Sequence, residues 1–248
     1  MLARRVLLIV PTLWVIATVT FFLMRLAPGG PFRSEREIPP VAREQLMRKY
    51  GLDRPLGEQY ARFLSNAVRL DFGVSYHYPG RTVREIIAEA FPVSAELGGW
   101  ALLLAVLLGV PLGVVAAVRK NGPADIGAMS VALAGISIPN FVLGPLLVMA
   151  FSLGLFLLPP ALWQSPASRV LPVVSFLGPA AARIVTGSIV VESIFAVPGL
   201  GRYLVNAAFN RDYTLVLGGV LFYALLLIVL NLLVDVAYTF LDPRVEMA

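Results

Sequence analysis

The stretch VVESIFAVPGLGRYLVNAAFNRDYTLVLGGVLFYALLLIVLNLLVDVAYTFLDPRV, residues 190–245, decides the fold of this chain. It begins as a polar hairpin, in which Pro198, Gly199 and Gly201 predict a turn because proline presets φ and glycine accepts conformations that other residues avoid. The apolar run that follows, residues 215–234, is long enough at about 1.5 Å per residue to cross about 30 Å of hydrocarbon. This end of the chain therefore predicts a membrane-spanning helix after a turn.

The composition places most of the chain in lipid. Hydrophobic residues make up 58% of the 248 residues and charged residues only 14%, and the mean hydropathy is +0.81. Soluble domains are about 45–50% apolar and about 25% charged. A soluble all-helical domain would have to hide several uncharged runs of membrane length in one core. The sequence has no cysteine, which excludes disulfides, iron–sulfur clusters and thiolate chemistry.

Five apolar runs are candidate spans: residues 6–24, 95–118, 127–158, 170–191 and 215–234. The positive-inside rule places Arg4 and Arg5, before the first run, and Arg119, after the second, on the cytoplasmic side. The first run is expected to stay uncleaved, because it is longer than the apolar core of a signal peptide and Arg25 follows it instead of a cleavage site. Pro139 interrupts the third run, as does Pro145.

A polar segment, residues 27–94, separates the first two runs and carries ten basic and eight acidic residues mixed together. That mixture is typical of a solvated region and not of a basic nucleic-acid-binding stripe. Short helices are predicted over residues 41–50 and from Pro55 onward. Apolar residues recur at helical spacing in two stripes: Leu56, Tyr60, Phe63, Leu64 and Ala67, and Val83, Ile86, Ile87 and Ala90. The second stripe leads into the second span and is expected to lie along the membrane surface.

Three motifs close the chain: E-S-I-F-x-x-P-G-L-G-R, N-R-D-Y-x-x-V and N-x-L-V-D-x-x-Y-x-x-x-D-P-R. They resemble the carboxy-terminal end of bacterial ABC importer permeases, and most of all the B-type subunit of oligopeptide and dipeptide permeases. FFLMRLAPGGPF (21–32), KYGLDRPLGEQYARFL (49–64) and FPVSAELG (91–98) agree with this resemblance. The motif residues that it singles out are Glu192, Pro198, Gly199, Gly201, Arg211, Asp212, Tyr213, Asp242 and Pro243.

The resemblance implies an all-α, polytopic fold of the type I ABC importer permease kind. It divides the chain into a first span (1–26), an extracytoplasmic polar segment (27–94), a permease core (95–241) and a tail (242–248). The implied partners are a second homologous permease subunit, two cytoplasmic ABC ATPases and an extracytoplasmic solute-binding protein, all at the bacterial inner membrane. The polar segment would then either meet the solute-binding protein or serve only as a packing connector. Oligopeptides are the expected substrate, and dipeptides, nickel chelates or other small solutes are the alternatives.

Four polar residues inside the apolar runs are candidates for the translocation pathway: Asn140, Arg183, Asn231 and Asp235. A charge in lipid costs at least a few kcal/mol, so it should face protein or water. For Asn140 the alternative is that Pro139 merely kinks a helix against its neighbour. For Arg183 it is a structural ion pair with Glu192 or Asp235, or snorkelling to an interface. Asn231 and Asp235 lie one helical turn apart in the last run. We expect them to pack between permease subunits in preference to contacting substrate.

One part of the family pattern is missing. The family has six spans and, between the fourth and fifth, a cytoplasmic loop that docks on the ATPase, whereas this chain has five runs and no polar loop between Arg169 and Arg183. The family repeats Leu-Pro-Val near the start of both spans, and here it occurs once, at residues 171–173. Five crossings would place residues 192–214 in the cytoplasm, where the family places them outside. A coupling-defective or non-transporting subunit is therefore a further alternative.

Enzymes are disfavoured because their catalytic residues are missing. A P-loop needs Gly-Lys-Ser/Thr, but Lys49 and Lys120 both follow arginine. The single histidine, His77, lies outside the apolar runs and cannot supply the histidine pair of a zinc protease, nor a base for a serine within a span. We expect no catalytic site, no metal and no cofactor in this chain, and ATP hydrolysis only in the partner ATPases.

Overall fold

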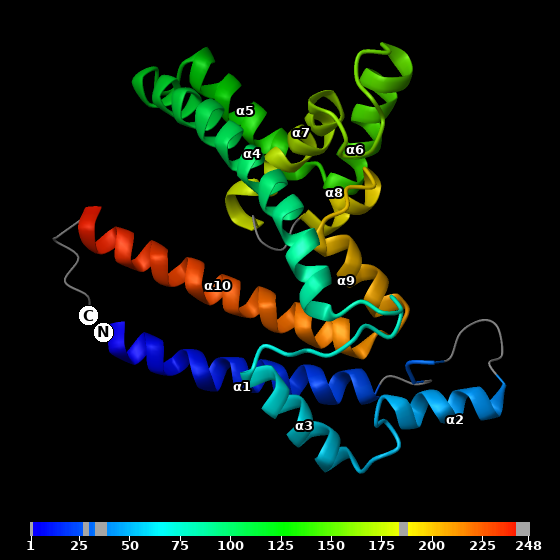
Figure 1. Cartoon of the computed structure of the whole chain (residues 1–248). Helices are drawn as coiled ribbons and strands as arrows, with labels where there is room; N and C mark the ends of the chain where they lie inside the picture. Colours follow the sequence, from blue (N-terminus) through cyan, green and yellow to red (C-terminus); the bar gives the residue numbers. More distant parts are fainter. Residues whose placement is uncertain (1, 27–29, 33–38, 184–187, 242–248) are drawn as a thin grey trace. The chain divides into compact units, whose positions relative to one another are not determined.

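The computed structural model describes residues 2–26, 30–32, 39–183 and 188–241, most of which lie in helices (Figure 1). Within these ranges the only β pairing is a single bridge between Val74 and Thr82. The predicted all-α fold is confirmed. The chain forms two compact units, Met1–Ile87 with Asn206–Ala248, here unit 1, and Ala88–Val205, here unit 2.

The helices in chain order are α1 (Leu2–Leu26), α2 (Pro40–Lys49), α3 (Leu56–Val68), α4 (Val83–Val118), α5 (Pro123–Ser137), α6 (Asn140–Leu147), the π-helix η1 (Val148–Gly154), α7 (Pro166–Arg183), α8 (Ser188–Ile194), α9 (Leu200–Phe209) and α10 (Tyr213–Leu241). Helices α2 and α3 confirm the two short helices predicted in the polar segment. The serial division into span, polar segment, core and tail concerns the membrane and stays a prediction.

Three helices of the described chain are long and apolar enough to cross a membrane, over Leu7–Leu26, Val83–Val118 and Tyr213–Leu233. In none of them is more than 28% of the most apolar stretch buried inside the protein. Their apolar surface is therefore left for lipid or for partner helices, as expected of spans. The first and last predicted spans, residues 6–24 and 215–234, are confirmed as parts of such helices.

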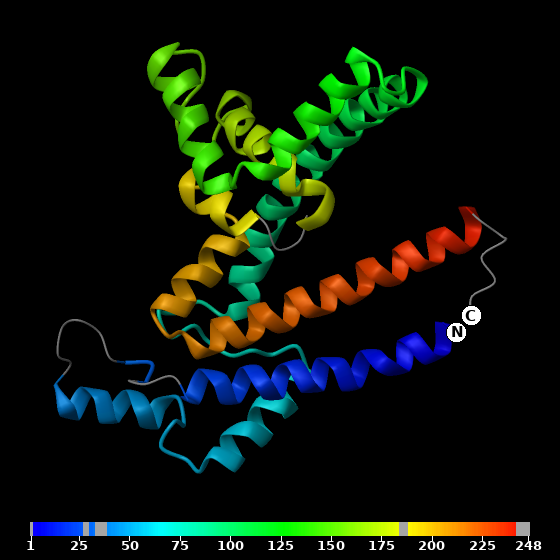
Figure 2. The same ribbon diagram turned by 180° about the vertical axis from the view of Figure 1, so that it is seen from behind.

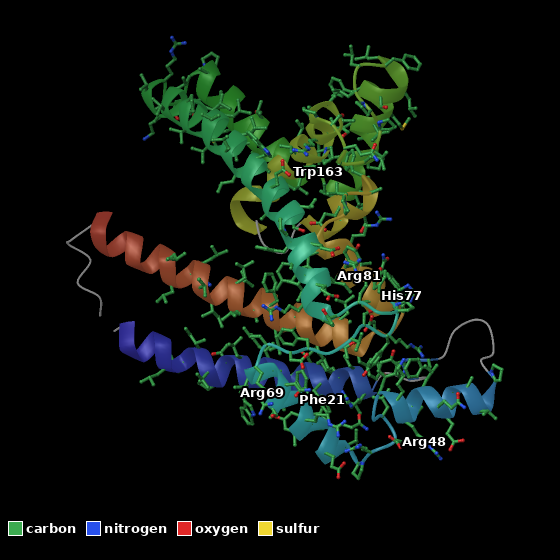
Figure 3. The ribbon with its side chains drawn as sticks, viewed as in Figure 1. Phe21, Arg48, Arg69, His77, Arg81 and Trp163 are labelled. Atoms are coloured by element: carbon green, nitrogen blue, oxygen red, sulfur yellow. The ribbon has the colours of Figure 1, made fainter. Side chains whose placement is uncertain are left out.

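In unit 1, α1 and α10 lie side by side and run in opposite directions (Figures 1 and 2). Phe21 of α1 is fully buried, and its ring centroid lies 5.2 Å from that of Tyr60 and 5.5 Å from that of Phe63, both on α3 (Figure 3). The hydroxyls of Thr18 and Tyr60 share a hydrogen bond of 2.7 Å. The predicted stripe on α3 thus uses its aromatic members to pack against the first span, while Leu56 at its start remains exposed.

Helix α4 corrects the prediction for the stripe before the second span. The helix begins at Val83, so the stripe is its first two turns and not a separate surface helix. Val83, Ile86, Ile87 and Ala90 are all buried in the protein. The start of α4 is fixed by a capping box: the Thr82 N–H donates to Glu85 Oε2 at 2.9 Å, and the Glu85 N–H donates to Thr82 Oγ1 at 3.2 Å. The helix therefore begins 12 residues, or about three turns, before residue 95, where the predicted apolar run starts.

The third apolar run folds into α5, α6 and the π-helix η1, with its main break at Pro139. Helix α5 ends at Ser137, and the chain changes direction before α6, whose N-cap residue Pro139 is extended with ψ 141° (Figure 2). Helix α5 thus ends before Pro139, in line with the bias of a residue before proline away from the helical conformation, and the chain turns back into α6. Pro145, in contrast, lies inside α6 and does not end it.

Unit 2 has a core in which α4, α7 and α8 meet the loop before α7. Its buried members are Leu97, Ala101, Trp163, Leu171, Val173, Val191, Phe195 and Val197. Gly144 lets α6 approach α8 closely, since a Cβ there would lie only 3.1 Å from the Phe195 ring. The fourth apolar run, residues 170–191, lies in α7 and α8, and residues 184–187 between them fall outside the described residues.

Candidate functional site

The first family motif builds a buried carboxylate in unit 2. Glu192, on α8, is fully buried and faces the amino terminus of α9. Its Oε2 accepts the backbone N–H of Arg202 at 3.0 Å, and its Oε1 accepts the hydroxyl of Ser94 at 2.7 Å. Ser94 Oγ in turn accepts the backbone N–H of Leu200 at 2.8 Å. One carboxylate and one hydroxyl thereby satisfy two N–H groups that α9 itself leaves unpaired.

The position of the Glu192 carboxylate is also electrostatically favourable. The amino terminus of a helix carries partial positive charge, which stabilises an anion placed against it. The chain reaches α9 through a tight turn in which the Val197 N–H donates to the Glu192 carbonyl at 2.9 Å and Ala196 adopts φ +52°. The motif therefore locks the α8–α9 corner instead of presenting a free carboxylate.

The structure corrects the reason for the motif glycines. Gly199 was expected to supply a conformation that other residues avoid, but the left-handed residue of this turn is Ala196, at φ +52°. A Cβ at residue 199 would instead lie 2.5–2.6 Å from both carboxylate oxygens of Glu192. Gly199 is thus required for close approach, and Gly201 lies within the first turn of α9. Pro198 precedes that helix and is exposed.

The second motif builds a matching carboxylate in unit 1. Asp212 is fully buried and caps α10: its Oδ1 accepts the Leu215 N–H at 3.2 Å and the Thr214 hydroxyl at 2.9 Å. Its Oδ2 accepts the His77 backbone N–H at 3.1 Å and the hydroxyl of Ser75. Asp212 thereby ties the start of the last span to the polar segment, whose His77 is labelled in Figure 3.

The neighbours of Asp212 in the motif have separate roles. Arg211 takes the left-handed conformation, φ +55°, that turns the chain from α9 into α10. Tyr213 is buried at the first position of α10, with the Arg25 guanidinium 5.7 Å from its ring centroid. Asp242 and Pro243, which complete the family motif, lie outside the described residues.

The candidate pathway residues remain predictions. Asn140 is the first residue of α6, Arg183 the last of α7, and Asp235 lies on α10, but their side chains lie outside the described part. Asn231, also on α10, is exposed. Asn231 and Asp235 do share one helix at one-turn spacing, as expected.

The sequence interpretation missed one charged cluster in unit 2. Glu96 of α4 forms an ion pair with Arg169 of α7, and it accepts the Trp163 indole N–H at 3.2 Å (Figure 3). The Arg169 guanidinium also lies 5.2 Å from the Trp163 ring. Glu96, like Ser94, lies in the FPVSAELG stretch, so the signal was present but was read only as part of a resemblance.

Metal chemistry finds no support among the side chains that the structure describes. No group of three or more histidine, aspartate or glutamate residues there is placed to hold a metal ion. The buried carboxylates, Glu192 and Asp212, have their oxygens occupied by hydroxyl and backbone donors. The geometry therefore supports fixed connections between helices.

Comparison with known proteins links these features to a family. Residues 1–98 match the family described as "Binding-prot-dependent transport system membrane comp, N-term", and residues 169–247 match "Binding-protein-dependent transport system inner membrane component". The two buried carboxylates lie in the second matched region. Together the matches cover more than half of the chain.

Curated relatives extend this similarity over almost the whole chain. The dipeptide transport system permease protein DppB of Bacillus subtilis is 38% identical over 290 residues, which cover 95% of this chain and 94% of that protein. The oligopeptide transport system permease protein OppB of Salmonella typhimurium is 37% identical over 299 residues, 98% of each chain. The Escherichia coli K12 protein of that name is 36% identical over the same length.

These alignments are longer than the chain itself. An alignment of 299 positions that takes in 98% of 248 residues, about 243, leaves about 56 positions of the Salmonella protein without a counterpart here. The difference is internal, since both proteins are covered to 98%. Its size is enough for one span of about 20 residues and a loop.

Proposed function

We propose a function from one premise: the chain belongs to the binding-protein-dependent transport system inner membrane component family. It is a permease subunit of an ATP-driven importer that moves peptides across the bacterial inner membrane. The observation that carries this function is the agreement of both ends of the chain with the family, together with helices long and apolar enough to span a membrane.

Oligopeptides are the proposed substrate. Relatives from Salmonella and Escherichia coli that are named for oligopeptide transport align over 98% of this chain, and one named for dipeptide transport aligns over 95%. Both classes share the peptide backbone and its charged termini. The candidate pathway residues Asn140, Arg183, Asn231 and Asp235 are the polar groups proposed to meet them or to join permease subunits.

The chain is proposed to work with four other subunits and to hydrolyse nothing itself. A second, homologous permease completes the pore, a solute-binding protein delivers peptide to the segment 27–94, and two cytoplasmic ABC ATPases supply the energy. Hydrolysis belongs to the ATPases, because this sequence has no Gly-Lys-Ser/Thr phosphate loop. In this arrangement Glu192 and Asp212 hold helix corners rigid while the subunits move.

The test is uptake of a radiolabelled tripeptide by cells that lack their own B-type permease but keep the other four subunits. Expression of this chain should restore uptake, and uptake should vanish when the binding protein is deleted. Membrane fractions must contain equal amounts of this chain and of a full-length relative used as the positive control. Failure of uptake with the chain inserted and bound to its partners would reject the transporting function.

That failure would instead favour a second candidate, a subunit that assembles without transporting. The observation in its favour is the set of about 56 aligned positions of the Salmonella relative that this chain lacks. A permease that lost the loop docking on the ATPase would still bind its homologous partner. Co-purification of the partner permease without the ATPases would identify this case.

A further inference from the structure

Unit 1 contains a cavity of about 240 Å³ whose lining is strongly basic. Arg25, Lys49, Arg54 and Arg62 line it, and Asp71 is the one acid among its lining residues. Arg25 lies in the last turn of α1, and Tyr213 and Thr214, at the start of α10, also line the cavity. Because both helices are candidate spans, the cavity lies where those spans end, at the level of lipid headgroups.

Most of the positive charge in this cavity has no acidic partner within the described chain. Arg54 pairs with Glu58 at 3.6 Å. Arg25 instead donates to the neutral Gln59 side chain at 3.0 Å and lies over the Phe21 ring, 3.4 Å from its centroid. Lys49 and Arg62 form no ion pair among the described residues. Among the described residues the cavity therefore carries more basic than acidic side chains, which favours an anionic ligand.

Tyrosines complete the wall without offsetting this charge. Tyr50 and Tyr76 line the cavity with ring centroids 4.6 Å apart. Burial raises the pKa of Tyr76 above its ordinary value, so its phenol stays protonated and neutral. Aromatic rings beside basic residues are the composition found where spans meet the headgroup layer.

A second cavity of about 340 Å³ adjoins the first and is almost entirely apolar. Phe72 lines both cavities. Val10 and Ala17 of α1, Ala67 of α3 and Leu221 of α10 contribute to its wall. On α1, Ala17 and Val10 lie 8 and 15 residues before Arg25, which is about 12–22 Å along the helix axis at 1.5 Å per residue. Along α1 the apolar cavity therefore lies farther from the basic end of the span than the basic cavity does. Its outer wall comes from the polar segment, through Leu64, Ala67, Val68, Leu70 and Phe72.

We propose that the two cavities form one binding site for an anionic phospholipid. The headgroup phosphate sits among Arg25, Lys49 and Arg62, and an acyl chain fills the apolar cavity beside α1 and α10. A peptide or an acidic protein surface could use the basic cavity alone, but it would leave the apolar cavity along two spans unfilled. A phospholipid carries its anionic headgroup and its hydrocarbon chains in the same order as the basic and apolar cavities follow one another along α1. The site concerns the lipid environment and does not depend on which solute is transported.

The test measures lipid binding to the full chain, purified in mild detergent and stripped of lipid, by native mass spectrometry. Palmitoyl-oleoyl phosphatidylglycerol is compared with phosphatidylcholine carrying the same acyl chains. We expect the unmodified chain to prefer phosphatidylglycerol. The double variant Lys49→Gln/Arg62→Gln should bind it about 30-fold more weakly, since each basic residue near a membrane surface contributes a factor of about five. Binding of phosphatidylcholine should not change.

Two matched controls keep the result interpretable. Arg43→Gln/Arg84→Gln removes the same charge from exposed positions outside both cavities and should leave lipid binding unchanged. Ala67→Trp fills the apolar cavity and should weaken both lipids, whereas Ala61→Trp, on an exposed position of α3, should not. Thermal melts confirm that each variant is folded.

Three results would overturn the proposal. The first is equal affinity for the two phospholipids. The second is an affinity for glycerol 3-phosphate, which has the anion but no acyl chain, as high as that for phosphatidylglycerol. The third is displacement of phosphatidylglycerol by an equimolar acidic tripeptide, which would make the basic cavity a carboxylate site instead.

Discussion

At the scale of single residues, Gly199 is the position where one added carbon should have the largest effect. Its missing side chain gives room to the Glu192 carboxylate, which would lie 2.5–2.6 Å from a Cβ. Gly199→Ala should therefore destabilise the chain by about 1–3 kcal/mol, the usual cost of overpacking. The measurement is the melting temperature of the detergent-solubilised protein, followed by fluorescence size-exclusion chromatography.

Gly109→Ala is the matched control for this glycine. Residue 109 lies inside α4 with nothing within 4 Å of an added Cβ. The same substitution there should be neutral or stabilising by up to about 1 kcal/mol, because alanine favours helix over glycine. An unchanged melting temperature for Gly199→Ala would show that the Glu192 corner is not as close as described.

Asp212→Asn tests the second buried carboxylate. Asp212 accepts four hydrogen bonds, from two backbone N–H groups and two hydroxyls, and an amide would turn one of its acceptors into a donor facing donors. The expected loss is about 1.5–3 kcal/mol, as for hydrogen bonds to charged groups, or roughly 3–12 °C in melting temperature. Asp53→Asn, at an exposed position, serves as the control. Equal melting temperatures for the two variants would contradict a capping role.

At the scale of elements, the open test is whether the first turns of α4 are buried in the protein or form an exposed surface helix. Ala88 is exposed on this helix, whereas Ala90 is buried. Since the chain has no cysteine, Ala88→Cys and Ala90→Cys each introduce a single thiol with little change in volume. A polar maleimide should label residue 88 readily and residue 90 at least about tenfold more slowly. Similar labelling rates at both positions would show that the stripe is not buried as described.

The elements also show how far sequence reasoning reaches. The first and last spans follow from the length of their apolar runs. The resemblance named Glu192 and Asp212 as motif residues, but their positions as buried helix caps come from the structure alone. The capping box of Thr82 and Glu85 has the sequence pattern T-x-x-E. Because that pattern was overlooked, the start of α4 at Val83 was not predicted. The reversal at Pro139 could not be separated from a kink, because both begin with the same missing N–H.

The structural roles of the motif residues could not be predicted from the sequence. Gly199 was assigned to a turn, yet it serves the approach of a carboxylate seven residues earlier in the sequence. Ser94 and Glu192 are 98 residues apart, and no local pattern announces their hydrogen bond. The basic cavity likewise draws Arg25 and Arg62 from separate helices. Such contacts depend on the tertiary fold, whereas periodicity and caps report only on the local chain.

At the scale of the whole molecule, the chain is a permease subunit with helices long and apolar enough to cross a membrane. Its three candidate spans leave most of their apolar surface uncovered by the chain itself. That surface suits lipid and a second permease subunit. Both buried carboxylates accept hydrogen bonds on each oxygen, which stabilises the helix corners that they cap.

The most direct measurement is peptide accumulation in proteoliposomes. This chain would be reconstituted with its partner permease and two ATPases. The solute-binding protein and a radiolabelled tripeptide are added on the side where the binding protein docks. ATP is supplied on the side of the ATPases. We expect the tripeptide to accumulate on the side of the ATPases above its starting concentration, only with ATP and only when this chain is present. Accumulation without this chain, or none from a fully assembled complex, would contradict this expectation.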